Sequence, residues 1–192
     1  MGTRNREKFG DHRLRFITTT CHEWLHLFNE ESDFSILAAS LQFVNDKHKA
    51  EILAYVFMPN HIHLIVLFEN GESISPYMHD FKRFTSVAIR KKMDLEGRHE
   101  LLEKIKVDSK EQKFKVWQDR FDDLYIRDIK ALQIKMNYMH ENPVRRGLAE
   151  ANSDYKYSSA GYYEKEEQGF MPVTHYLEAM GYANHYYYGR VF

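Results

Sequence analysis

The apolar residues of the N-terminal part recur first with the period of a strand and then with that of a helix. Leu14–Thr20 is rich in β-branched and aromatic residues, which predicts a strand. A polar stretch follows, and Ser32 or Asp33 is suited to begin a helix through residues 34–49. The apolar positions of this helix recur at helical spacing, at Phe34, Leu37, Leu41 and Val44.

Two apolar segments that follow each other closely predict a hairpin. Residues 52–57 and 61–68 each have the length of a buried strand, and the residues between them, MPN at 58–60, favour a tight turn. A second helix is predicted over residues 75–93, where the apolar positions roughly form one stripe.

The remaining chain is more polar and predicts one more strand and one more helix. The charged residues 98–113 are expected to form a solvated loop or a helix extension. Residues 114–118, FKVWQ, predict a fourth strand. Residues 127–142 predict a third helix that ends at Pro143, because the residue before a proline avoids the α conformation.

The order of these elements is β-α-β-β-α-β, which is the ferredoxin-like arrangement. We therefore predict an α+β sandwich, an antiparallel sheet with helices on one face, to which a helix carrying Tyr138 and a tail are added. The chain of 192 residues is expected to form a single domain. Its core would cover about residues 13–148 and its C-terminal extension about residues 149–192.

Composition restricts the class of protein more than its function. Hydrophobic residues make up 43% of the chain, which is enough for a folded core. The chain has no apolar run of about 18 residues and no signal-peptide stretch, so we expect a cytoplasmic protein without a membrane partner. The single cysteine, Cys21, fits a reducing compartment. A formal net charge of −1 neither indicates nor excludes a nucleic-acid partner.

His61 and His63 are two positions apart on a predicted strand. Side chains at such positions point to the same face, so two imidazoles can share one metal ion. The apolar residues Ile62, Leu64, Val66 and Phe68 are expected to point to the other face. Spacing alone leaves a metal site and a hydrogen-bonded structural pair as equal alternatives.

Tyr138 and Asn142 are four positions apart on the third predicted helix. Residues at this spacing lie on one helix face, so a phenol and an amide oxygen would be presented together. The alternative is a tyrosine at a helix end that packs on the core, and spacing alone favours that alternative.

The segment from His22 to His26 matches the H-E-x-x-H motif of zinc proteases. That motif requires a helix, which brings both histidines to one face, and a third ligand downstream. Here the motif directly follows a predicted strand, and no continuation of the longer protease signature is present. A zinc metalloprotease that uses His22, Glu23 and His26 is therefore a weaker alternative function.

Two groups of basic residues are candidates for contact with nucleic-acid phosphates. An ordinary solvated helix face would give the same pattern, and composition does not decide between the two. The candidates are Lys82, Arg83, Arg90 and Lys91 on the second predicted helix and Arg145 and Arg146 after the third.

Two separate motifs together resemble one known family. The segment YVFMPNHIHLIV at residues 55–66 resembles the HUH motif region of IS200-like transposases. The segment YMHENPVRRGL at residues 138–148 resembles their tyrosine-bearing helix, in particular that of the REP-associated tyrosine transposase branch. WQDRFDDLYIRD at 117–128 and YKYSS at 155–159 resemble the segments before and after this helix. The tail after about residue 160 matches nothing in the family.

The resemblance implies a role for each matching residue. His61 and His63 match the paired metal-binding histidines, and Tyr138 matches the single nucleophilic tyrosine. Asn142 stands where the family has a third metal ligand. The family's divalent metal is Mg²⁺ or Mn²⁺, and imidazole nitrogens suit Mn²⁺ better than Mg²⁺.

The resemblance also implies DNA transposition by nicking and strand transfer. The tyrosine attacks a phosphate of single-stranded DNA, often beside a hairpin or palindromic repeat, and forms a covalent 5′-phosphotyrosine while a 3′-OH leaves. The family includes monomers and homodimers, and the sequence leaves that choice open. A non-catalytic ferredoxin-like nucleic-acid-binding module is the main alternative, although the aromatic RNA-binding motif of such modules is missing from the strands.

Overall fold

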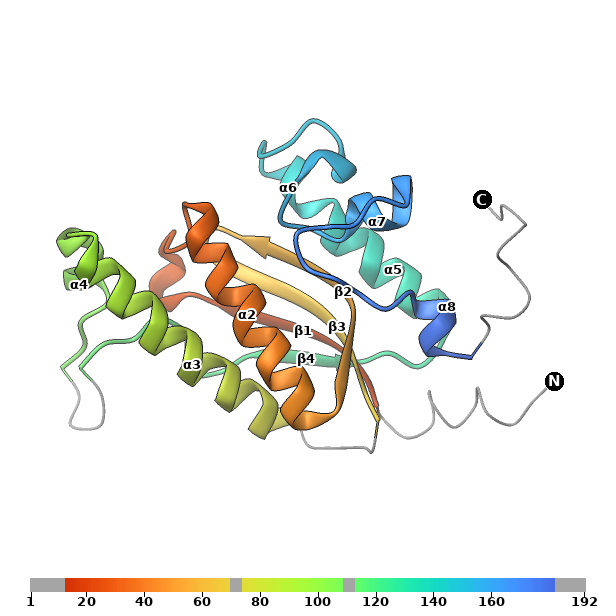
Figure 1. Cartoon of the computed structure of the whole chain (residues 1–192), viewed down its shortest axis with the longest axis horizontal. Coiled ribbons are helices and arrows are strands. Elements are labelled where there is room, and N and C mark those ends of the chain that lie inside the picture. Colours follow the sequence, from red (N-terminus) through yellow and green to blue (C-terminus); the bar gives the residue numbers. More distant parts are fainter. Residues whose placement is uncertain (1–12, 70–73, 109–112, 182–192) are drawn as a thin grey trace.

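The computed structural model describes residues 13–69, 74–108 and 113–181. Its centre is a four-stranded antiparallel sheet with the strand order β2-β3-β1-β4 (Figure 1). The predicted α+β fold with an antiparallel sheet is confirmed, and so are the bounds of the first and third strands. The four strands are β1 (Leu14–Thr20), β2 (Ala50–Met58), β3 (His61–Phe68) and β4 (Asp122–Tyr125).

The long helices cover opposite faces of the sheet. Helices α2 (Glu31–His48) and α3 (Ile74–Leu95) lie side by side on one face (Figure 1). Helix α5 (Ile129–His140), which carries Tyr138, packs on the other face. The short helical segments are η1 (His22–Trp24), α4 (His99–Lys104), α6 (Asn142–Arg145), η2 (Asn152–Asp154), α7 (Ala160–Lys165) and α8 (Tyr176–Ala179).

The alternation of side chains along β3 divides the apolar interior into two clusters. The residues predicted to face away from the histidines lie in the cluster under α2 and α3, and that prediction is confirmed. Ile65 and Leu67 lie in the other cluster, together with apolar residues of α5, which are Leu132, Met136 and Met139. His61 and His63 therefore point to the α5 side, because residues of one strand parity share one face.

Helix α2 is capped two residues before Ser32, the earlier of its two predicted caps. Its N-cap is Glu30, and Asp33 lies inside the first turn. The backbone N–H groups of Asn29 and Glu30 donate to Oδ2 of Asp33, at 3.0 and 3.2 Å. The Asp33 carboxylate thus satisfies N–H groups at the helix start from inside the helix, as the acidic residue of a capping box does.

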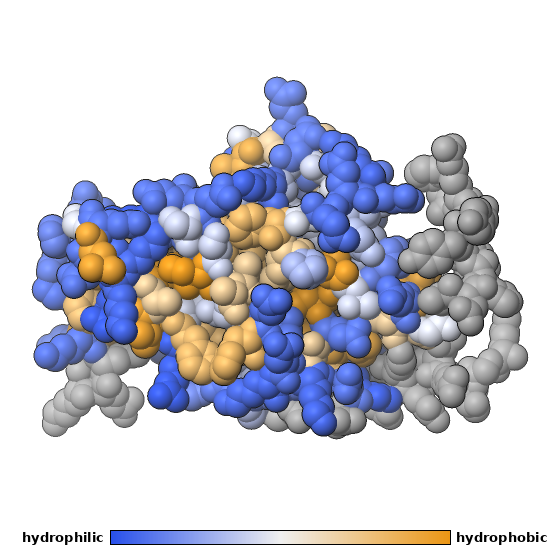
Figure 2. Space-filling view, in the orientation of Figure 1, coloured by the Kyte–Doolittle hydropathy of each residue, from blue (hydrophilic) through white to orange (hydrophobic). Residues whose placement is uncertain are grey.

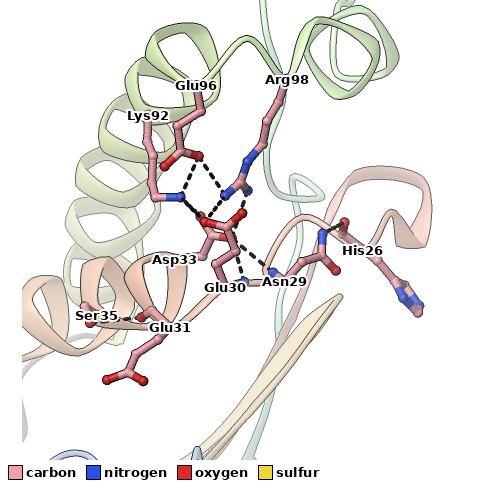
Figure 3. A network of polar contacts seen from close by, with 9 residues as sticks. All are labelled: His26, Asn29, Glu30, Glu31, Asp33, Ser35, Lys92, Glu96 and Arg98. Atoms are coloured by element: carbon pink, nitrogen blue, oxygen red, sulfur yellow. Dashed lines mark hydrogen bonds and ion pairs between the residues drawn. The ribbon is translucent and has the colours of Figure 1, made fainter.

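Asp33 also joins a network of ion pairs that connects the start of α2 to the end of α3 (Figure 3). Arg98 and Lys92 each approach its carboxylate to 2.9 Å. Burial raises the pKa of Asp33, but the hydrogen bonds from Arg98, Lys92 and the backbone outweigh burial and hold the pKa below its usual value. The same two cations also contact Glu30 and Glu96, so they are shared among three carboxylates.

The fourth strand is not where the sequence predicts it. Residues 114–118 form only isolated bridges, at Phe114 and Trp117, and the strand is β4, a few residues later. Val116 and Trp117 are buried in the cluster under α3, and the Trp117 indole donates to Oγ1 of Thr85 at 2.8 Å. The apolar pattern of 114–118 thus reflects core packing. Strand β4 lies at the sheet edge with exposed, charged side chains, so no apolar pattern predicts it.

The third predicted helix is divided into two. Asp128 accepts a hydrogen bond from the N–H of Ala131 at 2.7 Å and caps α5, which ends at His140. Pro143 does not terminate this helix but lies in the first turn of the short helix α6. A proline is tolerated there because the N–H groups of a first turn need no partner within the helix.

The C-terminal segment covers the outer edge of β2. Backbone N–H groups of Phe57, Ser159 and Thr174 donate to carbonyls across this edge at 2.9–3.0 Å, which pairs groups that would otherwise be open. Figure 2 shows the molecule in the orientation of Figure 1. On the visible face, apolar side chains are grouped in the middle and polar side chains surround them. No described helix is long and apolar enough to cross a membrane. The sequence offers no partnered motif for Tyr186, Tyr187 and Tyr188, which predicts packing residues, and all three lie outside the described residues.

Candidate active site

A pocket of about 370 Å³ lies on the α5 side of the sheet. Residues of β1, η1, β3, β4, α5 and α6 line it, so it joins segments from both halves of the chain. The structure brings together the four catalytic and metal-binding candidates there: His61, His63, Tyr138 and Asn142. The remaining lining residues are Phe16, Thr18, Trp24, Asp122, Asp123, Leu124, Lys135 and Arg146.

The two histidines are buried side by side on β3, with ring centroids 4.9 Å apart. Burial, with smaller contributions from the nearby Arg146 and His26, lowers the pKa of His61 to about 4. Burial lowers the pKa of His63 to about 3, with smaller contributions from His61 and Lys135. Both imidazoles are therefore neutral at pH 7, which is the form that binds a metal ion.

Each imidazole is oriented by a polar neighbour at its Nδ1 atom. Oγ1 of Thr18, opposite His63 across the β1–β3 pairing, lies 2.8 Å from Nδ1 of His63. Oδ1 of Asn60 lies 2.7 Å from Nδ1 of His61, and because this amide oxygen only accepts, the histidine donates. The Asn60 amide nitrogen donates to the carbonyl of Trp24 at 3.3 Å. The Nε2 atom of His61 thus retains its lone pair, as in metal sites with a second layer of hydrogen bonds.

Tyr138 enters the pocket from α5 and keeps 42% of its surface exposed. Its ring lies edge-on to His63 at 5.7 Å and to Phe16 at 6.2 Å between centroids. The charged groups of Lys135 and Arg145 lie 5.7 and 5.6 Å from the centre of the ring. The exposed phenol thus lies close to one imidazole and to two cations, of which Arg145 is also paired with Glu141.

Asn142 lies at the start of α6, and only 8% of its surface is exposed. Its amide nitrogen donates to the carbonyl of Tyr138 at 3.1 Å. The Oδ1 atom is therefore the one that could coordinate a metal ion. Although the predicted single helix is divided at Glu141, that residue keeps helical backbone angles, φ −75° and ψ −15°. Tyr138 and Asn142 therefore still line one pocket.

The donor atoms suit a divalent cation. Two neutral imidazole nitrogens and one amide oxygen form a nitrogen-rich set that fits Mn²⁺ better than Mg²⁺. Among residues 13–69, 74–108 and 113–181, no group of three or more His, Cys, Asp and Glu side chains could hold a metal. Asn142 could add an amide oxygen to the two imidazoles that line this pocket.

The H-E-x-x-H segment does not form the helix that a zinc protease requires. It forms the 3-10 turn η1, in which Glu23 and Trp24 have left-handed backbone angles, φ 50° and 59°. His22 and His26 therefore cannot share a helix face as zinc ligands do.

The basic candidates are divided between this pocket and a second hollow. Arg146 lines the pocket, and Arg145 lies over the ring of Tyr138 and forms an ion pair with Glu141. Lys82, Arg83 and Arg90 line a groove of about 740 Å³ between α3 and residues 113–121. Lys91 is exposed on α3 beside this groove.

Lys82 differs from the other basic candidates because its ammonium group is used within the protein. It donates to the carbonyls of Gln118, Asp119 and Arg120 at 2.9, 3.2 and 3.1 Å. Burial lowers the pKa of Lys82 to about 8. The side chain thus holds the loop that leads into β4.

Sequence reasoning missed several residues of the pocket. Asn60 directly precedes the histidine pair, and this adjacency was a usable signal. Thr18 and Phe16 become neighbours of His63 only through the β1–β3 register, which no local pattern contains. Trp24 and Asp122 come from a turn and an edge strand that the sequence did not predict.

Comparison with known proteins identifies the family. The family model described as "Transposase IS200 like" matches residues 11–142. A REP-associated tyrosine transposase from Haemophilus influenzae is 32% identical over 113 residues, which cover 57% of this chain and 58% of that relative. The structure of a REP-associated tyrosine transposase bound to a REP hairpin is similar in fold, with a TM-score of 0.59, 21% identity and coverage of 78% of both chains. Because the family model spans most of its length, the chain belongs to the IS200-like transposase family.

Proposed function

We propose that this protein is a metal-dependent enzyme that nicks single-stranded DNA and transfers the strand through a covalent 5′-phosphotyrosine. Tyr138 is the proposed nucleophile, and His61, His63 and Asn142 are the proposed ligands of Mg²⁺ or Mn²⁺. The observation that carries the proposal is that an exposed tyrosine and two neutral histidines line one pocket.

The proposed reaction uses the pocket residues in distinct roles. The Oη atom of Tyr138 forms a bond to phosphorus while the bond from phosphorus to the 3′ oxygen breaks. The phenol proton passes to solvent, and the departing 3′ oxygen takes up a proton. A bound divalent ion would polarise the phosphate and offset its charge. Lys135, which lines the pocket beside the Tyr138 ring, is proposed to provide further positive charge for the phosphate.

The covalent intermediate makes the reaction reversible in principle. The phosphotyrosine retains the energy of the broken phosphodiester, so attack by another 3′-OH restores a DNA strand and frees Tyr138. Tyr138 meets histidines of its own chain in the pocket, at 5.7 Å from the ring of His63. This arrangement supports a catalytic unit made by one chain, without the tyrosine of a partner.

The proposed substrate is single-stranded DNA beside a hairpin, as suggested by the similar transposase that was solved with a REP hairpin. Arg83, Arg90 and Lys91 are the proposed contacts to its phosphates along the groove beside α3. The guanidinium of Arg90 lies 5.4 Å from the centre of the Phe114 ring, so the groove combines charge with an aromatic surface. Lys82 contributes by holding the wall of the groove.

The test is incubation with labelled single-stranded DNA hairpins and Mn²⁺, followed by denaturing electrophoresis. We expect a denaturation-resistant protein–DNA band that Tyr138→Phe abolishes while DNA binding persists. Tyr162→Phe, on α7, is the matched control and should retain the band. A band that survives in Tyr138→Phe would refute the assignment. Binding without any band, equal in Mn²⁺ and in a chelator, would instead support a binding module.

A further inference from the structure

Trp24 is a large apolar side chain at the catalytic pocket that the proposed chemistry does not use. It lines the pocket, yet 56% of its surface is exposed, whereas the neighbouring aromatic residue Phe16 is 7% exposed. The indole lies at 66° to the ring of His61, with centroids 6.2 Å apart. Core packing therefore does not account for the position of this indole, and more than half of its surface is accessible to a ligand in the pocket.

The backbone that presents Trp24 is strained and firmly held. Two successive non-glycine residues, Glu23 and Trp24, have positive φ angles, a conformation that L side chains disfavour. The N–H of Trp24 donates to the carbonyl of Cys21 at 3.1 Å, and the carbonyl of Trp24 accepts from Asn60. The N–H of Cys21 donates to the carbonyl of Asn60 at 2.8 Å, so the turn is anchored to the β2–β3 hairpin.

Asn60 connects the indole to the metal-binding candidates. Its side-chain oxygen accepts from His61 while its side-chain nitrogen donates to Trp24. The same amide therefore fixes both the imidazole and the turn that carries the indole. Anything that rests on the indole is held in a defined position relative to His61.

The chemistry around the indole indicates its ligand. The pocket combines a flat exposed aromatic surface with the cations of Lys135 and Arg146. Such a combination suits a group that carries both a phosphate and a flat ring, which is a nucleotide with an unpaired base. On the basis of the proposed function, we propose that Trp24 stacks on the unpaired base next to the phosphate attacked by Tyr138.

The chain offers a direct optical test because it has two tryptophans, and Trp117 is buried with 4% of its surface exposed. In the Trp117→Phe variant, Trp24 is the single tryptophan. Emission is titrated with a single-stranded DNA hairpin in a chelator, which prevents cleavage, while the anisotropy of dye-labelled DNA reports binding. We expect quenching that follows the binding curve. If the Trp117 variant does not fold, the wild-type protein and Trp24→Phe are compared, and quenching should be much smaller in Trp24→Phe because the fluorophore is gone.

An abasic site moved one nucleotide at a time along the single-stranded flank locates the stacked base. We expect one position, beside the cut, at which the abasic site removes the quenching. Trp24→Ala should weaken binding about 5- to 150-fold, the range for losing one base–aromatic stack. Trp24→Phe should restore most of the affinity. Phe43→Ala, which removes an aromatic residue of similar exposure on α2, should change affinity little.

The results separate this inference from the proposed function. DNA binding without quenching, or equal loss of affinity in Trp24→Ala for normal and abasic DNA, would overturn the role of Trp24 even if the covalent band forms. Quenching in the chelator, together with no covalent band from the wild-type protein in Mn²⁺, would support the stacking surface and refute only the chemistry.

Discussion

Thr18→Val is expected to weaken metal binding in a protein that still folds. The change keeps the shape of the side chain but removes the hydroxyl that lies 2.8 Å from Nδ1 of His63. Loss of a residue that orients a metal ligand lowers metal affinity about 10- to 100-fold. The change also leaves the buried Nδ1 atom of His63 without this partner, so the free energy of unfolding should fall by about 1–3 kcal/mol. Calorimetric titration with Mn²⁺ measures the first effect and urea unfolding measures the second.

The next residue on β1 provides the matched control. Thr19 is buried, and no described residue forms a hydrogen bond with its Oγ1 atom. Thr19→Val therefore removes an unsatisfied polar group, so Mn²⁺ affinity should stay unchanged and stability should stay equal or rise. Thr18→Ser keeps the hydroxyl and should restore affinity. Unchanged Mn²⁺ affinity in Thr18→Val, or equal loss in Thr19→Val, would refute the role of this hydrogen bond.

Three further predictions concern the charged groups. Hydrogen bonds from Lys47 and His48 lower the pKa of Asp80 to about 2. The ionised carboxylate therefore stabilises the fold above about pH 4, and this contribution is lost as the pH falls toward 2. Asp80→Asn should reduce this acid dependence of the melting temperature in thermal melts. Arg98→Ala leaves the Asp33 carboxylate with fewer partners and should lower the free energy of unfolding by about 1–3 kcal/mol in urea, and a stability within about 0.5 kcal/mol of wild type would contradict the network. Lys82→Met should destabilise the protein because three carbonyls lose their donor, whereas Arg83→Ala should spare stability and reduce the salt dependence of DNA binding by about one phosphate contact.

The sequence alone determined the elements whose residues are buried in a regular pattern. The alternation in residues 61–68 predicts which side chains share a face, and it is enough to place His61 and His63 together. The four-residue spacing of Tyr138 and Asn142 likewise predicts that these two side chains lie on one side of the helix. This holds because the helical backbone continues through Glu141. Periodicity predicts such features because burial acts on each side chain according to its place in the local repeat.

Only the tertiary structure decided the features that depend on contacts between distant segments. Strand β4 is made of exposed residues, so its pairing with β1 leaves no apolar signal. The apolar pattern of 114–118 looked like a strand because Val116 and Trp117 are buried under α3. A local pattern records that a side chain is buried but not whether its backbone pairs with a neighbouring strand.

The same limit applies to the site. Thr18 reaches His63 through cross-strand register, and Trp24 reaches His61 through a strained turn held by Asn60. Local sequence patterns describe neighbours along the chain, whereas hydrogen bonds and ring contacts form between neighbours in space. The sequence by itself therefore determined the candidate nucleophile and metal ligands, and folding decided which residues orient them.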